Sequence, residues 1–226
     1  MKIRPIVLLC FDGIVQESIE LYNYIFSKNL PYTVFAKNYN NYDTDLIDII
    51  KKGTQHYGWE LGLYGSFGND NTVVQNGTDY KIIKNNIENN KNSLLNTLNI
   101  NPKSYACSQA KINPLIVSAC LDNNITLIRG GGEQFIDFVD KDINQINHYL
   151  VDNTKELSTM KGYIDNVITY GRIVCILTHG TTIDGQQSLY AKDSDYRELL
   201  NYIYEKRSIG EIEVLTFNEL YNRYIN

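Results

Sequence analysis

Short runs of apolar residues alternate with amphipathic segments along this chain. Two runs, Ile6–Phe11 and Ile173–Thr178, are almost continuously apolar and have the length of a strand. Such runs predict strands that are buried on both faces, as in a parallel sheet. Shorter segments predict further strands at Tyr32–Ala36, Trp59–Leu63, Tyr105–Cys107, Thr126–Ile128 and Val214–Thr216, whereas Asn147–Val151 fits no single pattern.

Between these strands, apolar residues recur at helical spacing. The clearest helix is Asp79–Leu98, where isoleucine and leucine return at steps of mainly four residues. Pro114 suits the first turn of a helix, so Pro114–Asp122 is expected to be a second one. The remaining helices are expected at Ser18–Lys28 with Ser18 as N-cap, Asp45–Lys52 ended by Gly53, Glu156–Tyr170, Tyr196–Arg207 and Asn218–Tyr224.

Strands that alternate with helices form βα units, whose crossover connections favour parallel strands. With about seven strands over 226 residues, we expect an α/β fold in which the sheet forms a distorted parallel (β/α) barrel. No repeat or linker interrupts the pattern, so residues 1–226 are expected to form one domain. The Asn-rich stretches 38–41 and 69–76 are expected to be exposed loops.

Composition excludes several classes of protein. The chain is 43% hydrophobic with 4 prolines, which argues against collagen-like and disordered proteins. Its formal net charge of -5 argues against binding to nucleic acid or to a membrane surface, because phosphate binding needs clustered lysine and arginine. No apolar run is long enough for a transmembrane helix or a signal peptide. We therefore expect a cytoplasmic or virion-associated protein, whose four cysteines are buried and reduced.

Polar residues follow several of the predicted strands. In parallel α/β folds the functional side chains lie at the carboxyl ends of the strands. Asp12, Tyr64, Arg129 and His179 each come directly after a predicted strand, so we expect Asp12, Tyr64 and His179 to approach one another there. Glu60 lies inside the third strand and is a further candidate, whose side-chain direction the sequence leaves open.

Several of these segments carry motifs in a recognisable order. The sequence LLCFDG at 8–13 ends a strand in the manner of the motif Thr-Phe-Asp-Asp-Gly. Residues 58–62 (GWELG) resemble Gly-His-Glu-Ile-Gly, 176–179 (ILTH) resemble Leu-Leu-His, and 213–220 (EVLTFNEL) resemble Val-x-Thr-Leu-x-Glu-Leu. This ordered set resembles the NodB-type polysaccharide deacetylase family over nearly the whole chain. The resemblance implies a distorted (β/α) barrel of about seven strands.

The resemblance also implies a chemistry, namely metal-dependent hydrolysis of N-acetyl groups on glycans. In that chemistry a divalent metal, usually zinc, polarises the acetyl carbonyl and lowers the pKa of a bound water. Carried over residue by residue, Asp12 matches the base and His179 the acid. Gly13 stands in place of the metal-binding aspartate, and Tyr64 and Gly68 stand in place of the two metal-binding histidines.

Other family positions have changed as well. Ala106 replaces an arginine, and Ser108-Gln109-Ala110 replaces Pro-Tyr-Gly. Since the three metal ligands are absent together, we expect no zinc site and no other cofactor. His56 and His148 are expected to be structural. An oxygen-rich cation site would need further carboxylates, such as Glu17 or Glu60.

Three functions therefore stay open. The first is a catalytically degenerate polysaccharide-deacetylase-like domain, a pseudoenzyme that binds a glycan through Tyr64, Glu60 and Arg129 or acts as a structural module. The second is a carbohydrate N-acetyl hydrolase that uses Asp12 and His179 with an atypical or relocated metal. The third is a structural component of a phage particle, which would have a protein assembly partner.

Overall fold

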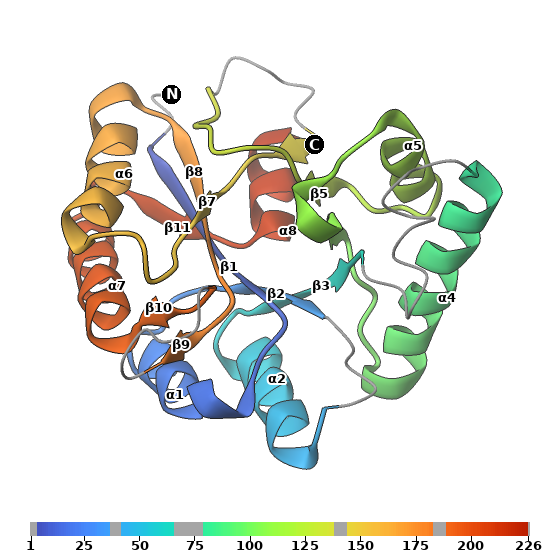
Figure 1. Cartoon of the computed structure of the whole chain (residues 1–226), viewed down its shortest axis with the longest axis horizontal. Helices are drawn as coiled ribbons and strands as arrows, with labels where there is room; N and C mark the ends of the chain where they lie inside the picture. The colour runs from blue at the N-terminus through green and yellow to red at the C-terminus, as the bar shows by residue number, and fades with distance from the viewer. Residues whose placement is uncertain (1–3, 37–41, 66–78, 138–143, 183–188, 226) are drawn as a thin grey trace.

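The computed structural model describes residues 4–36, 42–65, 79–137, 144–182 and 189–225. A parallel sheet runs through the middle of the molecule, and helices lie around its outside (Figure 1). At its centre, strands β1 (Ile6–Asp12) and β8 (Ile173–Thr178) pair in parallel, and every residue of both is buried. This confirms the expectation from their continuous apolar sequences.

The sheet has nine strands, in the order β6-β5-β4-β3-β2-β1-β8-β7, with β11 also pairing with β1. Strand β1 pairs with β11 through its first half and with β2 through its second half. Only Asn147 and His148 separate β6 from β7 in the sequence, so the two ends of the curled sheet are linked by two residues. The remaining strands of this sheet are β2 (Thr33–Ala36), β3 (Glu60–Tyr64), β4 (Ser104–Ala106), β5 (Leu127–Arg129), β6 (Gln145–Ile146), β7 (Tyr149–Leu150) and β11 (Glu213–Leu215).

This architecture is the parallel α/β barrel expected from the alternating pattern, with more strands than the seven expected. The difference comes from very short strands, because β6 and β7 have two residues each and carry too little periodicity to be recognised. Two further short strands, β9 (Thr181–Thr182) and β10 (Ala191–Lys192), form a separate parallel pair.

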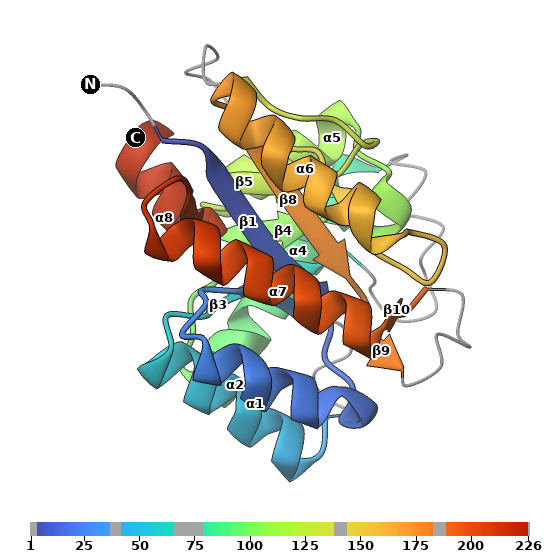
Figure 2. The same ribbon diagram turned by 90° about the vertical axis from the view of Figure 1, so that its left-hand side faces the viewer.

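Most helices pack on the outer face of the sheet (Figure 2), whereas Phe217 and Leu220 of the last helix belong to the core inside the barrel. Asp43, Asp79 and Asn113 cap three of them, each accepting hydrogen bonds from backbone N–H groups of the first turn. Within the described parts of the chain, no helix is both long enough and apolar enough to cross a membrane. The helices are α1 (Ile19–Ser27), α2 (Thr44–His56), α4 (Tyr80–Leu98), α5 (Pro114–Asp122), α6 (Leu157–Tyr170), α7 (Asp193–Ser208) and α8 (Phe217–Leu220).

Helix α2 continues past Gly53, where the sequence suggested that it would end. The indole of Trp59 packs against this glycine, and a Cβ added at Gly53 would lie 2.6 Å from two ring atoms of Trp59. Gly53 is therefore required for close packing inside the helix and does not cap it.

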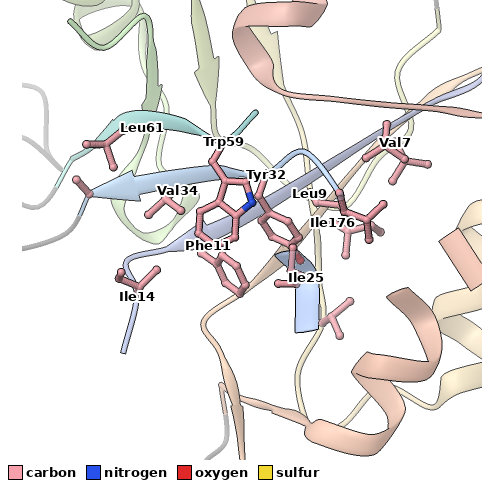
Figure 3. Packing of buried hydrophobic residues seen from close by; sticks show 14 of the residues in the cluster. Val7, Leu9, Phe11, Ile14, Ile25, Tyr32, Val34, Trp59, Leu61 and Ile176 are labelled. Atoms are coloured by element: carbon pink, nitrogen blue, oxygen red, sulfur yellow. The ribbon is translucent and has the colours of Figure 1, made fainter. Parts of the chain in front are cut away.

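Two apolar cores lie on the two faces of the sheet, because successive side chains of a strand point in opposite directions. The outer core fills the space between sheet and helices. Figure 3 shows part of it, where Phe11 and Tyr32 stack with ring centroids 4.5 Å apart beside Trp59. The inner core fills the barrel and includes Ile6, Leu8 and Cys10 from β1. Asp12 continues this inward-facing series at the carboxyl end of β1.

Candidate functional site

A buried ion pair crosses the carboxyl end of the barrel. Asp12 ends β1 and Arg129 ends β5, and three strands separate them in the sheet order. A guanidinium N–H of Arg129 donates a hydrogen bond to Oδ1 of Asp12, and the two side chains are only 1% and 5% exposed. The guanidinium also lies over the ring of Phe35, 5.2 Å from its centroid. The pair thus connects opposite sides of the barrel interior.

The charge of Arg129 is permanent in this environment. Burial by itself would lower the pKa of Arg129, but the Asp12 carboxylate has the opposite effect and the pKa is raised overall. Removing one partner of such a pair leaves an uncompensated buried charge, which costs about 3–5 kcal/mol. Asp12 and Arg129 therefore depend on each other for stability.

His179 and Tyr64 lie next to this pair. His179 follows β8, and its Nε2 is 3.7 Å from Oδ2 of Asp12. Tyr64 ends β3 and is buried, which raises the pKa of its phenol, and the negative charge of Asp12 raises this pKa further. Of the residues proposed from sequence, the structure therefore brings Asp12, Tyr64, Arg129 and His179 together at the carboxyl end of the barrel.

The loop after β4 has an unusual backbone conformation and holds the Tyr64 side chain. Gln109 and Ala110 both have positive φ values, 52° and 58°, although neither is glycine. The Ser108 hydroxyl and the Gln109 backbone N–H hydrogen-bond the Tyr64 phenol, and the Gly131 N–H donates to the Ala110 carbonyl at 2.8 Å. Left-handed backbone costs about 1–2 kcal/mol per residue outside glycine. Strain of this kind is concentrated at functional sites.

His148 belongs to the same cluster, although the sequence did not single it out as a site residue. It lies in the two-residue link between β6 and β7 and is 9% exposed. The pKa of His148 is lowered to about 3, mainly by burial and in addition by the nearby charges of Arg129 and His179. The imidazole is therefore neutral. A sequence signal for this position exists. If Gln145–Leu150 is treated as one strand with Ile146 facing inward, alternation places His148 inside the barrel as well.

Glu60 does not join this cluster, because it starts β3 whereas Tyr64 ends it. The Glu60 carboxylate accepts hydrogen bonds from the Ser104 hydroxyl at 2.6 Å, the Asn218 N–H at 2.8 Å and the Thr33 hydroxyl at 3.2 Å. Burial raises the pKa of Glu60, and these hydrogen bonds act against that rise. Glu60 thus connects β2, β3 and β4 to the start of α8 at the amino end of the barrel.

The residues at the family's metal positions do not fit a zinc ion. Gly13 has no side chain that could bind a metal, and its φ of 81° disfavours other residues. Burial raises the pKa of the Tyr64 phenol, and a neutral phenol is not among the usual zinc ligands. Gly68 lies outside the described residues. Among the residues that are described, no three His, Cys, Asp or Glu side chains are grouped so that they could hold a metal.

No protein-family model matches the sequence, and neither does any curated protein. Solved structures do share the fold, and they include polysaccharide deacetylases and family 4 carbohydrate esterases, abbreviated CE4. The CE4 domain of a multidomain xylanase from the hindgut metagenome of Trinervitermes trinervoides is 15% identical, with a TM-score of 0.61 over 97% of this chain and 91% of that one.

Two further matches describe the range of functions on this fold. A mutant of a CE4 family pseudoenzyme with restored enzymatic activity has a TM-score of 0.58 at 13% identity, over 97% of this chain and 68% of that one. The 4-alpha-glucanotransferase from Thermococcus litoralis has a TM-score of 0.69 at 10% identity, over 98% of this chain but 40% of that one. The fold expected from the NodB-type motifs is therefore confirmed, and this fold also occurs in a protein of different activity.

Proposed function

We propose that this chain is a catalytically degenerate domain with the CE4 deacetylase fold, and that it binds a glycan without hydrolysing it. The observation that carries this proposal is that both carboxylate oxygens of Asp12, the residue at the base position, already have neighbouring nitrogen groups. One of its carboxylate oxygens accepts a hydrogen bond from Arg129, and the other is 3.7 Å from His179. A general base must reach the proton that it removes, and both oxygens of Asp12 already face cationic or ring nitrogens.

The donor set supports the same conclusion. Hydrolysis of an acetamide on this fold requires a cation that polarises the carbonyl and activates water. Gly13 offers no side-chain ligand, and the Tyr64 phenol is held by hydrogen bonds from the loop after β4. The comparison with a CE4 family pseudoenzyme supports the idea that this fold persists in chains without activity.

A half-buried aromatic cluster supports glycan binding. Phe135, from the segment after β5, lies 4.8 Å from Tyr149 between ring centroids, and Tyr149 lies 4.3 Å from Tyr163. Burial raises the pKa of Tyr163, while nearby Lys155 lowers it and Glu133 raises it. Lys155 and Glu133 also form an ion pair with each other at 3.1 Å. Partly exposed rings beside charged hydrogen-bonding groups give the apolar surface and the polar contacts that a sugar needs.

Two measurements on the purified protein test this proposal. Acetate release from N-acetylated glycans, assayed with zinc, cobalt or manganese, should stay at background for the wild type and for Asp12→Asn. Binding to immobilised glycans should be detectable and should weaken by at least about threefold in Tyr149→Ala. Asp12-dependent acetate release would overturn the proposal and favour the hydrolase with an atypical metal.

The structural role is the alternative outcome of the binding assay. If no N-acetylated glycan is bound, the glycan-binding proposal fails, and a structural module, such as a component of a phage particle, is favoured in its place. Size measurements in solution would then be expected to show a stable assembly with a large interface.

A further inference from the structure

We infer that a cavity at the amino end of the barrel is a binding site for a neutral polyhydroxylated molecule of the size of a mono- or disaccharide. Its volume is about 350 Å³, and small-molecule sites have volumes of about 300–1,000 Å³. Glu60 borders the cavity at the start of β3, whereas Tyr64 ends that strand about 13 Å away, at about 3.3 Å per residue. The site is therefore separate from the carboxyl-end cluster, and its test does not require that cluster to bind a glycan.

Four segments that are far apart in the sequence form the cavity. They are the last turn of α2, the start of β3, the segment between α4 and β4, and the first turn of α8. The Glu60 carboxylate accepts hydrogen bonds from the Ser104 hydroxyl and the Asn218 N–H, so it joins β3 to β4 and to α8. A capping box between Thr216 and Glu219 fixes the first turn of α8. The walls are therefore held in place before a ligand arrives, which lowers the entropic cost of binding.

The two carboxylates of the lining are already satisfied within the protein. Glu60 accepts the three hydrogen bonds described above. Glu219 accepts a hydrogen bond from the Thr216 N–H at 3.0 Å and forms an ion pair with Arg223 at 3.2 Å. A ligand gains little from either group, and their negative charges repel a phosphate or another anion. The charge of the lining therefore favours a neutral ligand.

Three polar side chains of the lining keep unused hydrogen-bonding groups. They belong to Asn101 and Lys103 on one side of the cavity and to Asn218 on the other. Among the described parts of the chain, no side-chain hydrogen bond or ion pair joins any of the three to another residue. An amide donates and accepts hydrogen bonds, as a hydroxyl does, and an ammonium group donates three. Several hydroxyls on one ligand can therefore pair with all three side chains.

Apolar side chains complete the lining. Ile100 is half-buried beside Asn101, while Trp59 and Leu61 are buried at 5% and 2% exposure. A sugar ring presents a face of C–H groups together with its hydroxyls, so it needs an apolar wall beside a few polar groups. This is the usual composition of a small-molecule site. A saccharide therefore uses both kinds of surface that the cavity offers.

The first experiment uses Trp59 as a reporter, because it lines the cavity and is the only tryptophan of the chain. Its fluorescence is followed while the protein is titrated with glucose, N-acetylglucosamine, maltose or inorganic phosphate. At least one saccharide should give a saturable change with a Kd of about 10 mM or tighter, and phosphate should give none. Saturation by phosphate alone, or by none of the four, would overturn the inference.

The same titration of Tyr149→Ala separates this site from the proposed glycan site. The variant should give the same Trp59 response as the wild type, even where its binding to immobilised glycans is weakened. A Trp59 response that disappears in Tyr149→Ala would assign the signal to the glycan site and would overturn the inference.

The second experiment locates the binding with variants of the lining. Asn101→Ala/Asn218→Ala should weaken it by at least about tenfold and Lys103→Met by at least about threefold, since a hydrogen bond contributes roughly threefold to tenfold. Thr54→Phe should abolish it by filling the cavity from the last turn of α2. Asn96→Ala is the matched control, because Asn96 is exposed on α4 outside the lining and its replacement should leave the affinity unchanged.

Two outcomes of this second experiment contradict the site. A response that persists in a folded Thr54→Phe variant would be an effect of the bulk solution and would overturn the inference. Wild-type affinity in both Asn101→Ala/Asn218→Ala and Lys103→Met would overturn it as well, and these two variants decide the matter if Thr54→Phe does not fold.

Discussion

Ala106 and Arg129 are register partners on the adjacent parallel strands β4 and β5, and both side chains face the inside of the barrel. Adjacent strands are about 4.8 Å apart, so a long side chain from either position can reach the same part of the interior. Asp12 is the group that needs a counter-ion there. The barrel therefore offers two neighbouring positions from which one arginine can serve one carboxylate, and in this chain it comes from β5.

This equivalence predicts that the arginine can be moved back. Ala106→Arg combined with Arg129→Ala keeps the volume and the charge of the interior, so it should be more stable than Arg129→Ala alone by about 1–2 kcal/mol, part of the cost of an unpaired buried charge. Urea unfolding of the two variants gives the comparison. Ala106→Arg alone should be destabilised, because it adds a second buried cation. A double variant no more stable than Arg129→Ala would contradict the equivalence of the two positions.

The sequence predicted the fold better than the site, for a physical reason. The apolar runs of β1 and β8 and the stripe of α4 involve many residues each, so their burial is evident from periodicity alone. Pairing across the barrel has no such signal, because Asp12 and Arg129 are 117 residues apart. The position of Arg129 after a strand was predicted, but its partner was not.

Glu60 illustrates a second limit. Alternation along a strand indicates which face of the sheet a side chain occupies. It does not indicate whether that side chain lies near the amino end or the carboxyl end of the barrel. Glu60 and Tyr64 both face inward, but Glu60 starts β3 and Tyr64 ends it, and the two have different partners.

Ser18 was predicted as an N-cap and does precede α1. Its hydroxyl, however, hydrogen-bonds the backbone of Thr181 and does not cap the helix.

The strained turn after β4 predicts a stabilising substitution. Ala110 has a φ of 58°, a conformation that glycine adopts without steric penalty. Ala110→Gly should therefore stabilise the protein by about 0.5–1 kcal/mol. The free energy gained by relieving the left-handed strain exceeds the free energy lost because glycine gives the unfolded chain more conformational entropy. Thermal unfolding measures the change. Ala119→Gly is the control within helix α5, where the same substitution should destabilise the protein by about 1 kcal/mol or more. Destabilisation by Ala110→Gly would show that the turn is not strained.

Glu60 is predicted to affect stability without affecting the carboxyl-end cluster. Its three hydrogen bonds connect three strands to α8, and each hydrogen bond to a charged group contributes about 1.5–3 kcal/mol. Glu60→Ala should therefore cost about 3 kcal/mol or more in urea unfolding, while Glu60→Gln should cost less because its amide oxygen can still accept. Glycan affinity of the Glu60→Gln protein should equal that of the wild type. Loss of affinity in a folded Glu60→Gln variant would return Glu60 to the binding site.

His148 predicts how stability depends on pH. Its folded-state pKa of about 3 lies below the usual histidine value of about 6.5, so the unfolded chain binds a proton more readily than the native protein does. The contribution of His148 to the free energy of unfolding is fully present above about pH 6.5. It is lost as the pH falls from there towards 3, at up to about 1.4 kcal/mol per pH unit. Urea unfolding between pH 7.5 and 4.5 should follow this slope in the wild type.

The variant His148→Gln separates this effect from other titrating groups. Glutamine cannot be protonated in this range, so the variant should lose less stability between pH 7 and 5 than the wild type, by about 1–2 kcal/mol. His56→Gln is the matched control for the loss of an imidazole, because His56 is exposed at the end of α2. Carboxylates add a common slope to all three proteins, which the comparison removes. Parallel pH profiles for the wild type and His148→Gln would mean that His148 is not held neutral beside Arg129 and His179.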